Sequence, residues 1–325
     1  MARGQCEIMK TQAEILSVIA EFERGDGGTW RYPRFFAEVT ADSAVSEVSD
    51  TVGGSADTAE ASDTVGGSAD TAEASDTVGG SADTAKVSDT VVRLGKDDME
   101  HAARVLRMRD GDFAIVCDGG GTDYLAQFCG GGVRLIAKRA NMAEPSVALH
   151  LFMSALKGDR NEFVVQKAVE LGAAAVTPVL TKNCVAVPEP KSRVRKAERY
   201  RRIAYEAAKQ CGRGIIPCVH EYADFRFAVD SLCAAGRINP EKLAILFYEC
   251  EGGSLRDLAD TLGNAGGRVA ELAVFIGSEG GYTAGEVAYA QERGVHVVNL
   301  GRRILRADTA PVVALTLLSY LTKNL

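Results

Sequence analysis

The pattern of apolar and polar positions changes at about residue 145. Before that point, short stretches of alternating apolar and polar residues are separated by glycine-rich turns. Alternation with a period of two is typical of half-buried strands. It predicts strands at 34–40, 90–94, 112–118, 122–129 and 132–138. One helix is predicted at about 97–108, with Asp97 or Asp98 as its N-cap. This part of the chain is therefore expected to form a small β-barrel with one helix.

After residue 145, apolar strand-like runs alternate with helical segments. The runs occupy 147–156, 174–180, 243–249, 272–277 and 296–301, and the helical segments lie near 160–171, 191–210, 254–263, 284–293 and 309–322. This alternation predicts a doubly wound, mostly parallel sheet with helices on both faces. Ligands of such sheets bind beyond the carboxyl ends of the strands. The loops after 272–277 and 296–301 are thus the expected site.

Two segments lie outside these patterns. Residues 1–28 form an N-terminal extension that includes a short amphipathic helix. Residues 49–61 have the sequence SDTVGGSADTAEA. This sequence is repeated at 62–74 and, with two changes, at 75–87. Three copies with few large apolar residues cannot bury a core. We expect 42–89 to be a disordered, acidic insertion.

The net charge of −7 comes entirely from this repeat. Residues 49–87 hold eight acids and one base, which leaves 36 basic and 36 acidic residues elsewhere. The overall acidity therefore does not argue against a nucleic-acid substrate.

The eight cysteines are scattered without a CxxC pair, so no metal site is expected and reduced thiols in a cytoplasmic protein are the default. No apolar run is long enough for a transmembrane helix.

A glycine-rich segment, Gly277-Ser278-Glu279-Gly280-Gly281, follows one of the predicted buried strands. Glycines let backbone amides approach a ligand closely, and the following helix N-terminus adds a positive partial charge. A tight strand-to-helix turn needs glycine as well, so the residues alone leave both interpretations open. The segment is neither a GxGxxG nor a Walker motif, and this disfavours a Rossmann-type dehydrogenase.

An arginine-rich segment follows the last predicted strand. Three arginines, Arg302, Arg303 and Arg306, occur within five residues, and Asp308 then precedes an apolar helix. Arginines at the carboxyl edge of a sheet often meet an anion or a polar base. The helix at 309–322 is apolar almost all round, which predicts burial in the core or at a subunit interface.

A basic stretch spans residues 182–213, with ten bases and three acids. Such a face suits the phosphates of RNA, and Arg195, Arg199 and Arg202 are the candidate RNA contacts. The alternative is an ordinary solvated helix surface.

These segments together resemble a known family. The blocks DRNEFVVQKAVELGAAAVTPVLTKNCVAV, AYEAAKQCGRGIIPCV, FIGSEGGYT and LGRRILRADTA, in that order, are similar to those of the RsmE family of 16S ribosomal RNA (uracil-N3) methyltransferases, which are of the SPOUT class. RYPRFF and EHAARVLRMRDGD resemble that family's PUA-like barrel. The resemblance implies a PUA-like RNA-binding β-barrel at 29–143 and a SPOUT α/β domain with a C-terminal trefoil knot at 144–325.

The resemblance also implies a homodimer that binds S-adenosylmethionine and methylates one uridine of 16S rRNA or of the small ribosomal subunit. The positions that match the family's cofactor-binding residues are Gly277, Glu279, Gly280, Gly281, Leu300, Gly301, Ile304, Leu305, Arg306, Thr309 and Ala310. Ser278 stands where the family usually has proline, and Ala307-Asp308 stand for threonine and glutamate. Asp308 keeps the carboxylate on a shorter side chain.

Uracil N3 carries a proton at neutral pH, so the site must remove it or stabilise the resulting anion. Arg306 and Arg213 are the candidates for stabilisation, because guanidinium groups are permanent charges with forked donors. Glu279 and Asp308 are possible bases. Two other functions remain open: a SPOUT methyltransferase acting on another RNA such as tRNA, and a non-catalytic RNA-binding protein.

Overall fold

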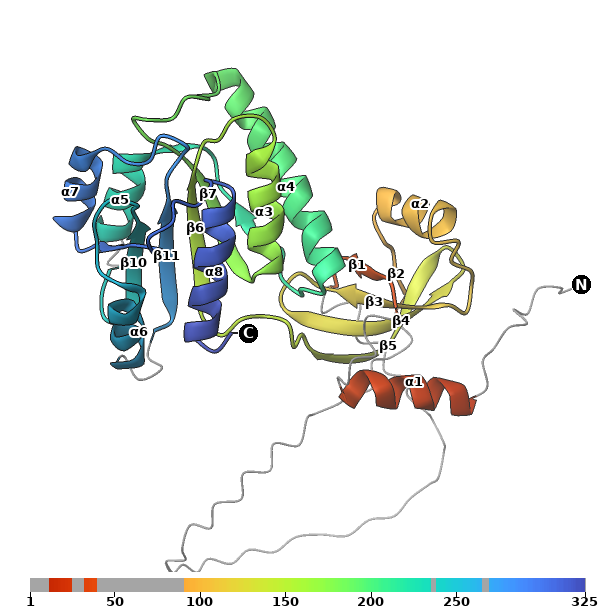
Figure 1. The fold of residues 1–325 in the computed structure, drawn as a ribbon. Coiled ribbons are helices and arrows are strands. Elements are labelled where there is room, and N and C mark those ends of the chain that lie inside the picture. Colours follow the sequence, from red (N-terminus) through yellow and green to blue (C-terminus); the bar gives the residue numbers. More distant parts are fainter. Residues whose placement is uncertain (1–11, 25–31, 40–90, 235–237, 265–268, 325) are drawn as a thin grey trace, which may run out of the picture.

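The structure is a computed structural model that describes residues 12–24, 32–39, 91–234, 238–264 and 269–324. The acidic insertion predicted at 42–89 lies entirely outside these residues, so its disorder stays a prediction. The described chain forms two sheets, each with its own helices, joined along one long helix (Figure 1). Within the described residues, no helix has the length and apolar character needed to cross a membrane.

The first sheet contains the five strands predicted before residue 145. Their order is β1-β3-β4-β5-β2, and every pairing is antiparallel except β1 with β3. The strands are β1 (Arg34–Phe36), β2 (Val91–Val92), β3 (Phe113–Cys117), β4 (Thr122–Cys129) and β5 (Gly132–Ala140). Phe35, Val116 and Leu135 belong to the core of this domain, beside helix α2 (Lys96–Arg104).

Asp98 has a different role from the predicted N-cap. Helix α2 begins after Gly95, and no side chain caps it. The Asp98 side chain instead accepts hydrogen bonds from Tyr205 Oη at 2.7 Å and from Lys209 Nζ at 2.6 Å. Asp98 therefore joins the two domains, a role that local sequence spacing could not reveal.

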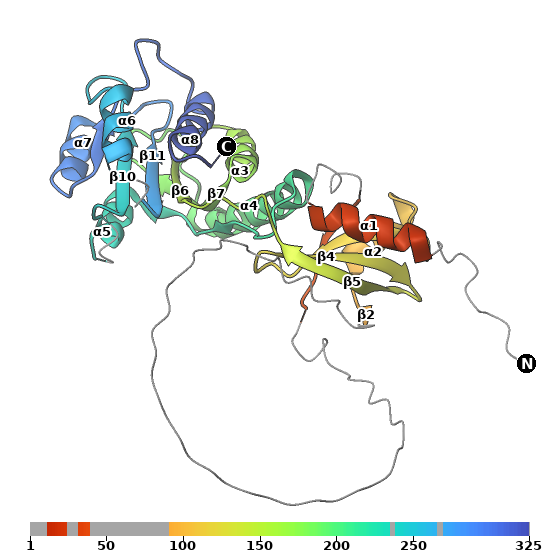
Figure 2. The ribbon, with the colours of Figure 1, turned by 90° about the horizontal axis from the view of Figure 1, so that it is seen from below.

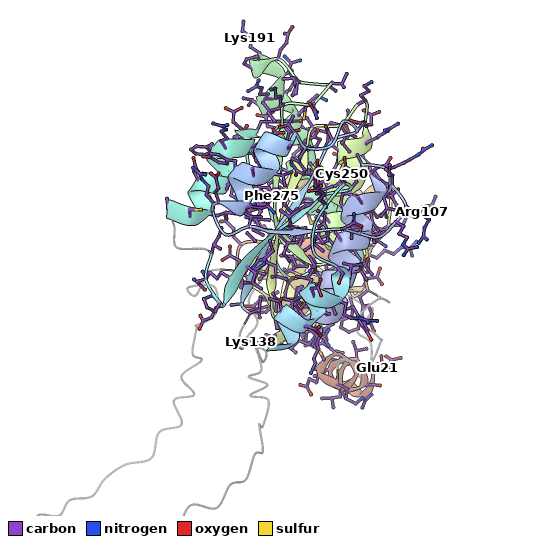
Figure 3. All side chains as sticks on the ribbon, turned by 60° about the vertical axis from the view of Figure 1, so that its left-hand side comes forward. Glu21, Arg107, Lys138, Lys191, Cys250 and Phe275 are labelled. Atoms are coloured by element: carbon purple, nitrogen blue, oxygen red, sulfur yellow. The ribbon has the colours of Figure 1, made fainter. Side chains whose placement is uncertain are left out.

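The amphipathic helix expected near the N-terminus is present as α1 (Gln12–Arg24), which packs against β5 (Figures 1 and 2). Phe22 is 3% exposed, and the guanidinium of Arg139 lies 4.5 Å from the centre of its ring. The apolar side of this helix thus contributes to the core, while Glu21 is half-buried on its flank (Figure 3).

The second sheet is parallel throughout, in the order β12-β10-β11-β6-β7-β8, with β9 also paired to β7. Its strands are β6 (Ala148–Ser154), β7 (Ala173–Leu180), β8 (Cys218–Val219), β9 (Ala223–Asp224), β10 (Lys242–Phe247), β11 (Glu271–Ile276) and β12 (His296–Val298). Side chains alternate between its faces, so Leu151 and Met153 enter one core while Phe152 and Phe275 enter the other. The predicted buried parallel sheet is confirmed.

Helices cover both faces of this sheet. Residues of α3 (Arg160–Glu170), α4 (Pro190–Cys211), α6 (Leu255–Asn264) and α8 (Thr309–Leu321) join one core, and those of α5 (Phe225–Ala234) and α7 (Ala284–Gln291) join the other. Helix α5 and the short strands β8 and β9 are absent from the prediction. The sequence of α5 does contain a helical pattern, because Phe225, Ala228, Val229 and Leu232 recur at helical spacing. All four side chains are buried.

Candidate functional site

A pocket of about 760 Å³ opens beyond the carboxyl ends of β10, β11 and β12. This is the edge of the sheet at which the sequence predicted the site. Three loops form the pocket, one after each strand, together with the start of α3. Its lining residues are Arg160, Phe247, Tyr248, Glu249, Cys250, Ile276, Gly277, Ser278, Glu279, Gly281, Asn299, Leu300, Gly301, Arg302, Arg303, Ile304, Leu305, Arg306, Ala307 and Ala310.

The loop after β11 is a tight turn that requires glycine at one position. Gly281 has φ +64°, and its amide donates to the carbonyl of Ser278 at 2.9 Å. A Cβ at Gly281 would also collide with the Glu249 carboxylate. The turn leads into α7 through a capping box, in which Thr283 and Glu286 each bind the other's backbone amide. The backbone of the loop is thus fixed before any ligand binds.

The loop after β12 is held to the loop after β10 by one side chain. Asn299 Nδ2 donates to the carbonyls of Tyr248 and Glu249 at 3.3 and 3.0 Å. Asn299 Oδ1 accepts the amide of Gly301 at 2.6 Å, where φ is +110°. Asn299 therefore fixes two walls of the pocket relative to each other.

Arg160 links the two carboxylates nearest the arginine-rich loop. Its Nη1 lies 3.2 Å from Glu279 Oε1, and its Nε lies 3.8 Å from Asp308 Oδ2. Glu279 Oε1 also accepts the amide of Lys157 at 3.1 Å. The two acids considered as bases are thus half-buried and both contact the same guanidinium.

The arginine-rich loop presents its charges to solvent. Arg302, Arg303 and Arg306 are all exposed and line the pocket. Within the described part of the chain, none of their guanidinium groups forms an ion pair or a hydrogen bond. Ile304 between them is 84% exposed. Such a loop is available to a polar or anionic ligand.

Comparison with protein families and with known proteins shows what this chain is similar to. The family model for an RNA methyltransferase domain matches residues 143–319, and that for an RNA methyltransferase PUA domain matches residues 94–128. Ribosomal RNA small subunit methyltransferase E of Synechocystis is 31% identical over 236 residues, covering 72% of this chain and 74% of that protein. The Bacillus subtilis protein of the same name is 28% identical and covers 70% and 90%.

The chain belongs to the ribosomal RNA small subunit methyltransferase E family, RsmE. A solved methyltransferase from Legionella pneumophila, with bound S-adenosylmethionine, is 26% identical with a TM-score of 0.59, over 71% of this chain and 91% of that one. The fold class, a PUA-like domain followed by a SPOUT-type α/β domain, is confirmed. The trefoil knot stays a prediction.

The structure brings most of the predicted cofactor residues of this RsmE chain into the one pocket. Those lining it are Gly277, Glu279, Gly281, Leu300, Gly301, Ile304, Leu305, Arg306 and Ala310, whereas Gly280 and Thr309 do not line it. A Cβ at Gly280 would lie 2.8 Å from the carbonyl oxygen of Asn183. A bulky residue at Gly280 would therefore disturb the packing of two loops before it could meet a ligand.

Arg213, the second candidate for stabilising the uracil anion, does not line this pocket. It is 3% exposed, and its Nη2 pairs with Glu144 Oε2 at 2.8 Å. Its Nη1 donates to the carbonyl of Ala173. Glu144 also accepts the amides of Gly214 and Ile215. A guanidinium that is buried and already paired holds the segment after β5 against β7 rather than an anion in the pocket.

The three arginines proposed to contact RNA lie on α4. Arg195, Arg199 and Arg202 are all exposed, and Arg199 pairs with Glu162 of α3 at 2.6 Å. Helix α4 runs from an outer tip, where Lys191 projects, to the barrel domain (Figures 1 and 3). Their exposure is compatible with contacts to RNA and equally with a solvated surface.

Sequence reasoning missed several lining residues, among them Arg160, Tyr248, Glu249 and Asn299. Two signals could have found two of them. Arg160 is the second residue of the first block that resembles the family, and Glu249 ends a predicted strand at the edge where ligands bind. The role of Asn299 had no such signal, because it depends on which loops are neighbours in space.

Proposed function

We propose that this chain transfers a methyl group from S-adenosylmethionine to N3 of one uridine in 16S ribosomal RNA, the position numbered 1498. The observation that carries the proposal is the pocket beyond β10, β11 and β12. It combines two glycine-containing loops with an exposed Arg306 that has no charged partner among the described residues. The family of the chain is that of small-subunit ribosomal RNA methyltransferases, which supports rRNA as the substrate class.

The residues of the pocket suit S-adenosylmethionine. Its volume of about 760 Å³ is within the roughly 300–1,000 Å³ of small-molecule sites. Ile276, Leu300 and Leu305 offer apolar surface for an adenine ring. Glu249 and Glu279 offer carboxylates to hydroxyl, amino or sulfonium groups. The bound cofactor would supply an activated methyl group, so the protein mainly has to position and desolvate the reactants.

The difficult step for this chain is the proton on uracil N3. Removing it leaves negative charge on N3 and on the two carbonyl oxygens of the ring. Arg306, exposed on the pocket wall, can stabilise that charge with its forked donors. Glu279, which lines the pocket, and Asp308, which contacts the same Arg160 guanidinium, are candidate acceptors of the proton. The target base has to be unstacked to reach these groups.

Two features support a larger assembly. The exposed arginines of α4 suit the phosphate backbone of 16S rRNA or of the small ribosomal subunit. Helix α8 is apolar almost all round, and Tyr320 near its end is 72% exposed. A second copy of this chain would cover that surface and form the homodimer that the resemblance implies.

The decisive experiment is mass spectrometry of nucleosides from 16S rRNA of cells with and without the gene. We expect N3-methyluridine at one position to disappear and to return when the gene is restored. Loss of a methylated nucleoside from the tRNA fraction instead would move the substrate to tRNA. Calorimetry of the purified protein with S-adenosylmethionine tests the cofactor independently, and a lack of binding would favour a non-catalytic RNA-binding protein.

A further inference from the structure

A second cavity, of about 470 Å³, lies between the two domains and outside the cofactor pocket. Its walls come from β1 and its preceding residues, from α2, from the end of β5 and from the last turns of α4. The lining residues are Tyr32, Pro33, Arg34, His101, Leu106, Asp123, Arg139, Asn141, Met142, Ala143, Glu206, Lys209, Gln210 and Gly212. Nothing in the proposed methyl transfer uses this cavity.

The floor of the cavity is a rigid network of paired charges around Asp123, which is fully buried. Arg34 donates to both carboxylate oxygens of Asp123 at 2.7 and 2.9 Å. Asn141 Nδ2 donates to Asp123 Oδ1 at 2.9 Å and to the carbonyl of Gly212 at 3.0 Å. Lys209 is paired with Asp98. The floor is therefore preformed and nearly neutral.

Arg139 belongs to the same network: its Nη1 donates to the carbonyl of Phe22, and its Nη2 lies 3.8 Å from Asp123 Oδ2. Its Nε is buried and has no hydrogen-bond partner among the described residues. One face of that guanidinium packs on the ring of Phe22. His101 and Gln210 are exposed, with side chains that both donate and accept. Tyr32 and His101 add planar rings. Planar surfaces with mixed donors and acceptors suit a nucleobase.

The arginine face of α4 leads into the cavity. Arg195, Arg199, Arg202, Glu206 and Gln210 follow one another at spacings of three or four residues, so they share one face of the helix. From Arg199 to Gln210 this face extends roughly 16 Å, at about 1.5 Å per residue.

The other end of that face contacts helix α3, whose first residue lines the cofactor pocket. The ion pair between Arg199 and Glu162 ties it to the first turn of α3. The first residue of the same turn, Arg160, lines the cofactor pocket. The α4 face therefore leads from the cavity between the domains to the helix that borders the cofactor pocket.

We propose that the cavity between the domains binds a single unstacked base of the substrate RNA, a few nucleotides from the methylated uridine. The proposal rests on the proposed function and deepens it, because it gives the enzyme a second point at which to read its RNA. Phosphates of the intervening nucleotides would follow the arginines of α4. A phosphate in the cavity itself is disfavoured, because the cations Arg34 and Arg139 are held by Asp123 and Lys209 by Asp98, and Glu206 adds a further negative charge to the lining.

The test combines a protein variant with RNA lacking single bases. A short fluorescent RNA that spans the target uridine is prepared with an abasic nucleotide at each position in turn. Its dissociation constant is measured with the wild-type protein and with His101→Ala/Gln210→Ala. For the wild type, we expect one abasic position away from the target to weaken binding about tenfold, within the range for losing a stacked base.

The double variant should bind the intact RNA about tenfold more weakly, and the same abasic position should then cause no further loss, because protein and base act through one contact. Affinity for S-adenosylmethionine and the melting temperature should not change. The matched control is Gln291→Ala/His296→Ala, which removes two exposed side chains of the same types on the far side of the sheet domain. It should behave as the wild type in every measurement.

Independent, additive effects of the variant and the abasic position would overturn the proposal, as would the lack of any sensitive position besides the target. If every abasic RNA binds equally while the variant weakens binding of all of them, the cavity contacts the backbone and not a base. These outcomes are separate from failure of the proposed function, which would appear as wild-type protein that binds RNA but leaves the target uridine unmethylated.

Discussion

Arginines have opposite surroundings in the junction between the domains and in the cofactor pocket. In the junction, the side chains of Arg34 and Arg213 are 9% and 4% exposed, and carboxylates hold them at 2.7 and 2.8 Å. In the pocket, Arg302, Arg303 and Arg306 are exposed and have no charged partner among the described residues. A buried guanidinium must be paired because desolvation is costly. An exposed guanidinium beside a concave site remains available to a ligand.

A sequence block that is shared with a family does not by itself assign a role to each of its residues. Arg213 and Arg306 both lie in blocks that resemble RsmE, and both were candidates for stabilising the uracil anion. Their neighbours differ: Arg213 meets Glu144, whereas Arg306 meets solvent. The predictions below separate a role in holding the domains together from a role in the reaction.

The largest effect is expected at Arg213. Arg213→Ala should lower the free energy of unfolding by about 3–5 kcal/mol, since it leaves Glu144 charged and unpaired. Urea unfolding followed by circular dichroism measures this. Arg213→Met/Glu144→Gln should recover much of the loss, because the amide oxygen can still accept the backbone N–H groups. A stable Arg213→Ala protein with abolished methylation would return Arg213 to a catalytic role.

Arg306→Ala should lower kcat for methylation by about 100-fold, a typical loss for one charge-stabilising donor. The melting temperature should stay the same, because the side chain is exposed. Single-turnover assays with rRNA and saturating S-adenosylmethionine provide the rate. Arg104→Ala on α2, where the arginine is 78% exposed, is the matched control and should not change the rate. A rate within threefold of wild type would exclude Arg306 from charge stabilisation.

Replacement of Arg195, Arg199 and Arg202 by glutamine should weaken RNA binding and flatten its salt dependence. Each lost phosphate contact should reduce the slope of log K against log salt by about 0.7–0.9. Binding titrations at several salt concentrations measure the slope. The surface ion pair of Arg199 with Glu162 contributes little to stability, so melting should not shift. Arg104→Gln/Arg256→Gln is the control. An unaltered slope in the triple variant would identify this face as ordinary solvated surface.

The smallest effect is expected for Tyr205 at the junction, in how the free energy of unfolding changes at alkaline pH. Burial and the hydrogen bond to Asp98 raise the pKa of Tyr205, and Glu206 acts in the same direction. A raised pKa in the folded state means that the stabilisation is complete below the ordinary value of about 10 and is lost as pH rises beyond it. Tyr205→Phe should therefore cost about 1 kcal/mol at neutral pH but show a weaker decline above about pH 10. Urea unfolding across this range tests it, and parallel curves would contradict the assignment.

Part of the site could be predicted because the parallel sheet fixes where ligands bind. The runs at 243–249, 272–277 and 296–301 were readable as buried strands, and their carboxyl ends must meet at one edge. That argument and the family blocks together placed Gly277, Gly281 and most of the other cofactor candidates. Gly280 does not line the pocket, and its Cβ position faces Asn183 from another loop. Local spacing cannot report which loop packs against a glycine.

The sequence by itself determined the two sheets, most of their helices and the family of this chain, because apolar periodicity and ordered motif blocks are local properties of the chain. Only the tertiary structure decided that Asp98 joins the domains, that Arg213 is buried against Glu144, and that a cavity lies between the barrel and α4. Each of these depends on contacts between residues about 70 to 110 positions apart. A charged side chain looks the same in sequence whether it faces water or a buried partner, and its surroundings decide its role.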